Sequence, residues 1–223
     1  GGQPGKSVEI TARGRYLDGL SEIRFARGQD IRTEIRSSTF YEFHALVHIG
    51  PKVPPGLYEY RVITPRGNYA GRFHVGSGAA IQETEPNNDI ANAQNITLPV
   101  TVDGIVDEAD YDHYRFHANA GETIVFDVIG NRASSFLDAK LAILDENGKE
   151  LQFNDDYYLA GDPHLAFTAP KAADYIVEVS HAYEFGNKDF SYRLIGGAYP
   201  FADRVLPAGV QRAASTELEM IGA

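Results

Sequence analysis

The stretch Glu83-Thr84-Glu85-Pro86-Asn87-Asn88-Asp89 divides this chain into two parts that both predict β-structure. It places three carboxylates and two side-chain carbonyls in seven consecutive residues. A folded chain tolerates such a density of like charge only if the charges are solvated or hold a cation. Ca²⁺ suits these hard oxygen ligands, because it takes about 6 to 8 oxygens in a flexible geometry. The stretch therefore predicts a calcium site, and a polar interdomain turn is the alternative.

A second acidic run, at residues 103–112, strengthens the metal hypothesis. From Asp110 onward the sequence alternates, so that Asp110 and Asp112 are in phase with Tyr114 and Phe116. If these aromatic rings face the core, the two carboxylates lie at the rim of the same face. No Lys or Arg occurs between the first acidic stretch and Tyr114. A cation shared by the two acidic runs would neutralise them.

Composition favours a soluble protein made of many short strands. The 223 residues include 22 Gly, 11 Pro, 13 Tyr and 12 Phe, and they contain no Cys. Disulfide scaffolds, thiolate metal sites and Cys nucleophiles are thereby excluded. No apolar run approaches the roughly 18 residues that span a bilayer, so we expect no membrane insertion. The first residues lack the apolar core of a signal peptide, and we expect the chain to be a trimmed piece of something longer.

Charge is distributed unevenly along the chain. Residues 1–78 carry 11 Lys and Arg against 7 Asp and Glu, whereas residues 79–197 carry 7 against 21. The second part therefore repels nucleic acid and anionic membranes, and we expect it to bind neither. It attracts divalent cations instead. A solvated acidic surface would explain the total charge but not its clustering.

Residues 1–78 predict an immunoglobulin-like β-sandwich. Strand-forming residues between Gly, Pro and Asp indicate strands at residues 7–11, 22–25, 31–35, 39–49, 56–64 and 68–75. The segment Thr64 to Asn68 predicts the turn of a hairpin. Val8 to Thr11, Pro55 to Tyr58 and Phe73 to Val75 resemble an IPT/TIG-type immunoglobulin-like domain. That resemblance implies a spacer or a protein-contact module.

Residues 79–197 predict a second β-sandwich, and the chain is all-β as a whole. Strands are expected at residues 123–129, 141–144, 150–153 and 175–179. The chain here resembles the bacterial pre-peptidase C-terminal (PPC) domain over Glu83 to Asn88, Asp110 to Phe116, Leu141 to Gly148, Ala173 to Val179 and Tyr192 to Leu194. The resemblance implies a jelly-roll-like sandwich that accompanies the catalytic domains of secreted proteases. Relatives of this family include the collagen-binding domains of bacterial collagenases.

The PPC resemblance also implies a set of calcium ligands. In such relatives a Glu-x-Glu-x-Asn segment and the acids before an Asp-x-Asp strand hold calcium. Carried over by position, the ligands are Glu83, Glu85, Asn87, Asn88, Asp110 and Asp112.

We find no catalytic motif in the sequence. None of the seven His residues lies in His-Glu-x-x-His, and no Gly-x-Ser-x-Gly or phosphate-binding loop occurs. The His residues at positions 113 and 117 are expected on a solvated strand face. We therefore expect no enzyme, but a non-catalytic accessory segment of a secreted, cell-surface or periplasmic bacterial protein. Calcium would make the linker and the PPC-like domain rigid.

An alternative function is the binding of an extracellular polymer, either polysaccharide or fibrous protein. Exposed aromatic side chains would carry it, although residues at the edge of the core are the simpler explanation. The candidates are Tyr157, Tyr158, Tyr183 and Phe185. Neighbouring domains of the same chain are the other expected partners.

Residues 198–223 predict a linker and the possible start of a further immunoglobulin-like repeat. Ser215 to Gly222 has Ser, Glu, an aliphatic residue and Gly at the same offsets as Ser7 to Gly14. If this similarity reflects a repeat, the natural protein is an array of alternating sandwiches.

Overall fold

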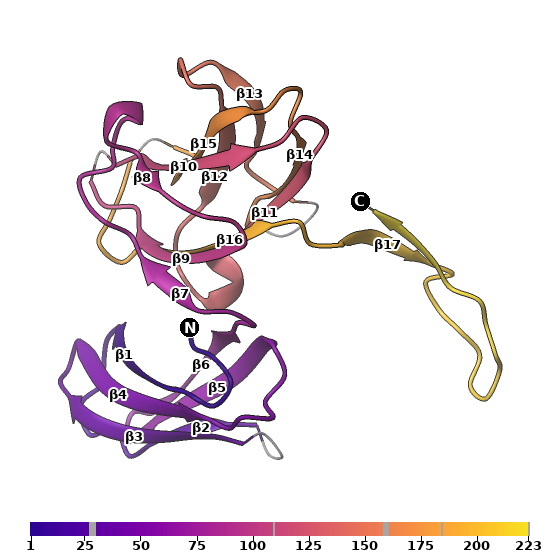
Figure 1. Ribbon diagram of the computed structural model, residues 1–223. Coiled ribbons are helices and arrows are strands. Elements are labelled where there is room, and N and C mark those ends of the chain that lie inside the picture. Colours follow the sequence, from indigo (N-terminus) through magenta and orange to yellow (C-terminus); the bar gives the residue numbers. More distant parts are fainter. Residues whose placement is uncertain (27–29, 109, 158–160, 184, 223) are drawn as a thin grey trace.

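The computed structural model describes residues 1–26, 30–108, 110–157, 161–183 and 185–222. Within these ranges the chain is all-β, with two sandwiches in contact and a hairpin that projects from the second one (Figure 1). The short helical turns η1 (Ile90–Asn92) and η2 (Asn131–Ala133) are 3₁₀ turns. No helix in the described part of the chain is long and apolar enough to cross a membrane.

The first sandwich consists of two antiparallel sheets of three strands each. One has the order β1-β4-β3 and the other the order β2-β5-β6. Thr64 pairs with Gly67, so β5 and β6 form the predicted hairpin. The strands are β1 (Ser7–Arg13), β2 (Glu22–Phe25), β3 (Ile31–Ser38), β4 (Glu42–Ile49), β5 (Gly56–Thr64) and β6 (Gly67–Val75).

Alternation along β4 builds the core of this sandwich. Phe43, Ala45, Val47 and Ile49 are all buried, while the side chains between them point away. This is the pattern of a strand with one face on the core. Phe25 and Phe73 from the opposite sheet close the core, with their ring centroids 5.8 Å apart.

The second sandwich has two sheets of five strands. Their orders are β13-β12-β15-β10-β8 and β14-β11-β16-β9-β7. The strands are β7 (Ala80–Gln82), β8 (Gln94–Asn95), β9 (Val100–Ile105), β10 (Asp112–Ala118), β11 (Thr123–Ile129), β12 (Ala139–Leu144), β13 (Glu150–Asn154), β14 (His164–Thr168), β15 (Ala173–His181) and β16 (Ser191–Gly197).

Aromatic side chains fill the core of the second sandwich. Phe116 of β10 lies 5.0 Å from Phe126 of β11, centroid to centroid, and so joins the two sheets. Tyr175 of β15 contacts Phe167 of β14 at 5.0 Å. Tyr114 and Phe116 are buried, as the alternation from Asp110 onward predicts. Burial of each such ring contributes about 1.5–3 kcal/mol of hydrophobic stabilisation.

The linker between the sandwiches becomes part of the second one. Gly76 donates its N–H to the carbonyl of Gly2, at 2.9 Å. Ala80 then begins β7, which pairs in parallel with β9 and forms an edge of its sheet. Because β7 ends at Gln82, the acidic stretch begins at the residue after this strand.

Arg193 of β16 joins the two sandwiches at their junction. Its side chain is buried and donates to both oxygens of Asp103, at 2.6 and 2.7 Å. Its Nη1 also lies 3.1 Å from Nδ1 of His74 in the first sandwich. Burial and the charge of Arg193 lower the pKa of His74 to about 4, so that its ring is neutral and accepts this hydrogen bond.

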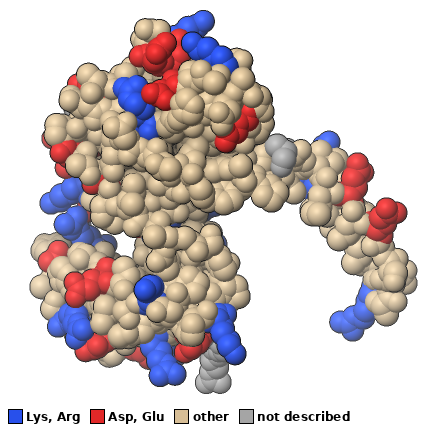
Figure 2. All heavy atoms as spheres, in the orientation of Figure 1, with Lys and Arg blue, Asp and Glu red and all other residues tan. Residues whose placement is uncertain are grey.

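Two further contacts connect the sandwiches. The N–H of Arg72 donates to Oγ of Ser134, at 3.0 Å. Nη1 of Arg13 lies 2.7 Å from Oδ1 of Asp189, in an exposed ion pair. Figure 2 shows the resulting shape, two lobes that touch and a thinner arm that leaves the upper lobe. The arm is a hairpin of β17 (Ala202–Leu206) and β18 (Glu219–Gly222).

Candidate metal centre

The edge strand β7 positions Glu83. The N–H of Glu83 donates to the carbonyl of Asp103, at 3.0 Å, and so extends the pairing of β7 with β9. Both of its carboxylate oxygens accept from the N–H of Ile105, at 2.9 and 3.0 Å. The carboxylate of Glu83 therefore lies over the end of β9.

Asn87 and His113 fix the linker against the second sandwich. The carbonyl of Asn87 accepts from the backbone N–H of His113 and from its ring Nδ1, both at 3.1 Å. The Nε2 atom of the ring lies 3.1 Å from Glu178 of β15. Burial lowers the pKa of His113, but its hydrogen bond to Glu178 and the charge of Glu178 outweigh this and raise it. The ring of His113 therefore joins the linker to β15.

The burial of His113 corrects the expectation of a solvated strand face. Only 6% of its surface is exposed, because Asn87 and Glu178 cover the side of β10 from which it projects. His117 farther along β10 is exposed and pairs with Asp174, as expected for a solvated face.

Asp112 begins β10 and has no exposed surface. Its Oδ2 accepts from the hydroxyl of Tyr192 at 2.7 Å. The hydroxyl of Tyr114 lies 2.5 Å from that of Tyr192, and in turn donates to it. Tyr192 projects from β16 of the other sheet, so this chain of hydroxyls crosses the core and ends at the carboxylate.

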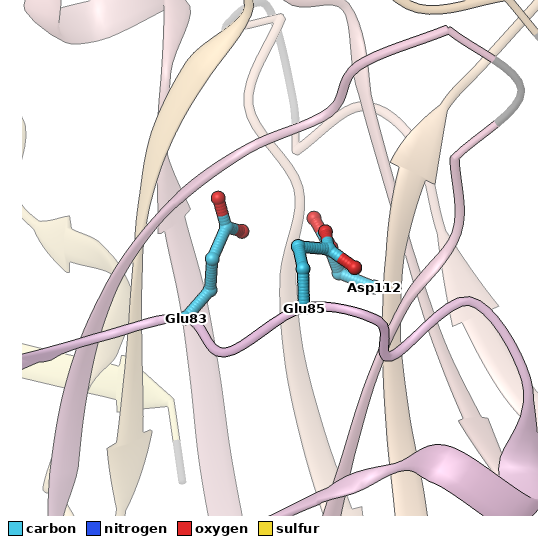
Figure 3. Close-up of side chains that lie close together, drawn as sticks. All are labelled: Glu83, Glu85 and Asp112. Atoms are coloured by element: carbon cyan, nitrogen blue, oxygen red, sulfur yellow. The ribbon is translucent and has the colours of Figure 1, made fainter.

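Three carboxylates converge at this point (Figure 3). Glu83, Glu85 and Asp112 each offer an oxygen, and these oxygens lie within 4.8 Å of one another. Among the described residues, no Lys, Arg or His forms an ion pair with any of the three. Burial and the neighbouring negative charges raise the pKa of Asp112 to about 9 and that of Glu83 to about 7.

Asp110 borders the cluster and has an unsatisfied oxygen. Its Oδ2 accepts from the N–H of Asp107 at 3.1 Å, whereas its Oδ1 is buried without a hydrogen-bond partner. The residue is 7% exposed, and burial raises its pKa. A buried acceptor without a partner costs about 1–3 kcal/mol, so a bound ligand would relieve it.

The side chain of Asn87 closes the cluster. Its Oδ1 faces only acceptors. With the amide turned over, its nitrogen would donate to Glu85 Oε2 and Asp112 Oδ1, both at 3.1 Å. In the unturned orientation the amide oxygen faces two carboxylates, an arrangement that a cation would stabilise.

The cluster contains the donor set that calcium prefers. Carboxylate and amide oxygens are hard ligands, and the residues that converge offer neither sulfur nor imidazole nitrogen. The structure brings together Glu83, Glu85 and Asp112, with Asn87 in contact and Asp110 beside them. Asn88, the remaining predicted ligand, is exposed.

Two contributors to this site are not predicted by the sequence patterns. Tyr192 supplies a hydroxyl to Asp112, and Ile105 supplies a backbone N–H to Glu83. The signal for Tyr192 is its alternation with Leu194, which is also buried. No sequence signal could reveal Ile105, because its backbone N–H makes the contact and any residue other than Pro would supply it.

The aromatic candidates lie elsewhere on the second sandwich. Tyr183 is 73% exposed and Phe185 is 54% exposed, and the ring centroid of Phe185 lies 5.7 Å from that of the core residue Phe190. Their rings gather around His181, with the centroid of Phe185 4.1 Å from that of His181. Tyr157 is half-buried with its ring 4.8 Å from His164, and Tyr158 lies outside the described residues.

The part of the chain that carries Asp112 matches a known protein family. Residues 110–181 match the bacterial pre-peptidase C-terminal domain. The chain therefore contains a PPC domain, and its match begins at Asp110 and includes Asp112 and His113. Glu83, Glu85 and Asn87 precede the matched residues. The IPT/TIG assignment of the first sandwich and the boundaries at residues 78 and 197 stay predictions.

One curated relative is similar over most of the chain. It is the Deinococcus radiodurans protein named "Probable subtilase-type serine protease DR_A0283", 26% identical over 224 aligned positions that cover 81% of this chain. The alignment covers 29% of the relative, so this chain spans less than a third of its length.

Two solved structures are similar to parts of the chain. The pre-peptidase C-terminal domain of a Bacillus anthracis collagenase is 19% identical, with a TM-score of 0.39, and the match covers 51% of this chain and 99% of that domain. The Bacteroides ovatus protein SGBP-B, solved in complex with a mixed-linkage heptasaccharide, is 10% identical with a TM-score of 0.28. That match covers 86% of this chain and 70% of SGBP-B.

Proposed function

We propose that this chain is a non-catalytic accessory segment of a secreted or cell-surface bacterial protein, and that calcium makes its linker and PPC domain rigid. The observation that carries the calcium proposal is the buried Asp112 carboxylate beside Glu83 and Glu85, without a basic partner among the described residues. The Deinococcus radiodurans relative, named a probable subtilase-type serine protease, supports an origin in a bacterial protease-like protein.

The proposed ligands come from two segments that the ion would join. Glu83, Glu85 and Asn87 belong to the linker, whereas Asp110 and Asp112 belong to the start of β10. Deprotonation of Asp112 would accompany binding, since a carboxylate ligand binds in its charged form. The buried Oδ1 of Asp110, which has no hydrogen-bond partner, would be a further ligand. Rigidity of the linker would then fix the angle between the two sandwiches.

Thermal unfolding of the metal-stripped protein, with and without millimolar CaCl₂, tests this proposal. A ligand that binds the native state alone adds about 2.7 kcal/mol at a hundredfold excess over its dissociation constant. For a chain of this size we expect a rise in the midpoint of roughly 5–10 °C. The variants Asp112→Asn and Glu85→Gln should abolish the rise. Each replaces a carboxylate by an amide of nearly the same shape and so removes one negative charge from the site.

Glu146→Gln is the matched control, because Glu146 is an exposed acid on the turn between β12 and β13. It should leave the calcium response intact. A wild-type midpoint that does not respond to calcium would refute the proposal. So would an equal response in Asp112→Asn, which would place the ion elsewhere.

The non-catalytic role is a separate part of the proposal. We expect purified chain to release no peptides from casein or gelatin, with calcium or without it. Steady hydrolysis that survives repeated purification would contradict this part and leave the calcium proposal untouched.

Polymer binding is the second candidate, and the exposed pair Tyr183 and Phe185 favours it. Large exposed rings can mark a binding surface. Co-sedimentation with insoluble glucan, chitin and fibrillar collagen would test it, with Tyr183→Ala and Phe185→Ala as variants. Phe136→Ala is the control, since Phe136 is 81% exposed at another site. Wild-type protein that stays in the supernatant with every polymer would remove this candidate.

A further inference from the structure

The C-terminal segment 209–222 has no core of its own. Within the described part of the chain, β18 pairs only with β17, in a two-stranded sheet that stands apart from both sandwiches (Figure 1). A two-stranded hairpin alone is marginally stable in water. Leu218 and Met220 are nevertheless apolar, and they are 54% and 74% exposed. Alternating apolar residues indicate a strand that buries one face.

This segment repeats the first fourteen residues of the chain without a gap. Residues 209–222 align with residues 1–14 at a constant offset of 208. Five of the fourteen aligned pairs are identical: Gly1 and Gly209, Gln3 and Gln211, Ser7 and Ser215, Glu9 and Glu217, Gly14 and Gly222.

The backbone repeats as well, which is independent of these identities. The N–H of Lys6 donates to the carbonyl of Gln3 at 3.2 Å, and the N–H of Ala214 donates to the carbonyl of Gln211 at 3.2 Å. The third residue of each turn has a positive φ, 73° at Gly5 and 62° at Ala213. A positive φ is uncommon for a residue with a Cβ, so the shared turn indicates a shared structure.

The burial pattern of β1 explains the apolar residues of the segment. In β1, Val8, Ile10 and Ala12 are half-buried and pack on the core, while the residues between them are exposed. The equivalents of Ile10 and Ala12 are Leu218 and Met220. The equivalents of the exposed Glu9 and Thr11 are Glu217 and Glu219. At these four positions the segment keeps the inner and outer faces of β1, whereas Thr216 stands at the place of Val8 and Ile221 at the place of Arg13. Leu218 and Met220 are exposed, so nothing among the described residues covers this inner face.

We propose that residues 209–222 are the first strand of a sandwich of the same kind as residues 1–75. The partner is a chain segment with the strands of residues 15–75 and no first strand of its own. Residues 209–222 would pair with the edge of its β4 equivalent. In β1, Ile10 pairs with Ala45 and Ala12 with Phe43, so Leu218 and Met220 would take these two places.

An extended chain tests this proposal, with residues 15–78 joined directly after Gly222. This junction reproduces the one between Gly14 and Arg15. Hydrogen–deuterium exchange should show that the amides of residues 215–221 slow by at least about 100-fold relative to the unextended chain, the protection of a strand in a folded sandwich. The attached residues should become protected in step with them.

Two variants of the extended chain distinguish a specific strand from a general effect. Leu218→Asp with Met220→Asp puts charges on the inner face and should abolish the protection. Glu217→Gln with Glu219→Gln changes the same number of residues on the outer face and should leave the protection unchanged. A reference chain carries residues 1–78 after residue 208, so that the attached sandwich has its natural first strand.

Protection in the reference chain combined with fast exchange of residues 215–221 in the extended chain would overturn the proposal. Equal protection in the Leu218→Asp, Met220→Asp variant would overturn it too, because pairing would then not depend on the inner face. Neither result depends on calcium, so both are distinguishable from failure of the proposed metal site.

Discussion

Two buried carboxylates of the PPC-containing sandwich have opposite surroundings. Asp162 is 1% exposed and accepts four hydrogen bonds from N–H groups: three from the backbone of residues 130–132 and one from the Arg132 side chain. Asp112 has no exposed surface and accepts from one hydroxyl, with Glu83 and Glu85 beside it. Fixed N–H donors and a guanidinium replace water for Asp162. Asp112 must hold a proton or find a cation.

A cluster of acids around a buried carboxylate indicates a ligand site more strongly than a single buried acid does. Asp162 is part of a closed structural network, since Arg132 also donates to Asp127 and to the carbonyl of Val128. The Asp112 cluster is electrostatically incomplete among the described residues. Only the second kind of arrangement supports a ligand.

The largest effect we expect is on Asp162. Asp162→Ala leaves Arg132 and three backbone N–H groups without their acceptor, and should cost about 3–5 kcal/mol of unfolding free energy. The loss should be the same in calcium and in chelator, which urea titrations in both conditions would show. A loss that calcium restores would mean that the two carboxylates are not independent, and the comparison would fail.

A smaller effect concerns the pH dependence of the metal-free protein. The folded pKa of Asp112 is about 9, above its value of 3.8 in the unfolded chain, so the folded state binds the extra proton between these values. Stability from this proton is fully present at low pH and is lost as pH rises through 9. We expect Asp112 alone to lower the unfolding free energy by roughly 2.7 kcal/mol between pH 6 and pH 8.

Urea titrations of metal-free protein at these two pH values would measure the fall. Saturating calcium should remove it, because the ion takes the place of the proton. Asp112→Asn should also reduce it, although Glu83 and Asp110, with raised pKa values of their own, would keep part of the slope. A metal-free protein whose stability rises over this range would contradict the assignment of a protonated Asp112.

The smallest effect we expect is at Asn88, in contrast to its neighbour Asn87. Asn88 is exposed, so Asn88→Ala should change stability by less than about 0.5 kcal/mol and leave the calcium response unchanged. Asn87 is fully buried against Glu85 and Asp112, and Asn87→Ala should weaken the response clearly. Calorimetric titration of both variants with calcium would compare them. A weaker response in Asn88→Ala would add Asn88 to the ligands.

Alternation in the sequence predicts β10 and the face of Asp112, whereas β9 (Val100–Ile105) and β14 (His164–Thr168) were not among the expected strands. Tyr114 and Phe116 are buried as expected, and the acidic stretch lies beside Asp112 as the shared-cation hypothesis requires. The burial of His113 could not be predicted in this way. A period of two separates two faces of a strand, but it does not say that a linker from another part of the chain covers the outer one.

The contacts between the two sandwiches could not be predicted from sequence patterns either. Arg193 resembles any polar residue on an outer strand face, yet it is buried between Asp103 and His74. Its position depends on how two separately patterned sandwiches meet. Local propensity carries no information on that contact, whereas the turn at Thr64 to Gly67 follows from its residues alone.

The parallel pairing of β7 with β9 has a mechanical consequence. Ala80 of β7 and Ile195 of β16 both pair with Thr101, from opposite sides of β9. Since neighbouring strands are about 4.8 Å apart, the chain enters and leaves this sandwich at points roughly 10 Å apart, at the same end of one sheet. A stretching force on the chain would therefore pull across the strands and open β7 one hydrogen bond at a time. The next residues to be pulled away would be Glu83 and Glu85, so tension would take the proposed metal site apart before it reached the core.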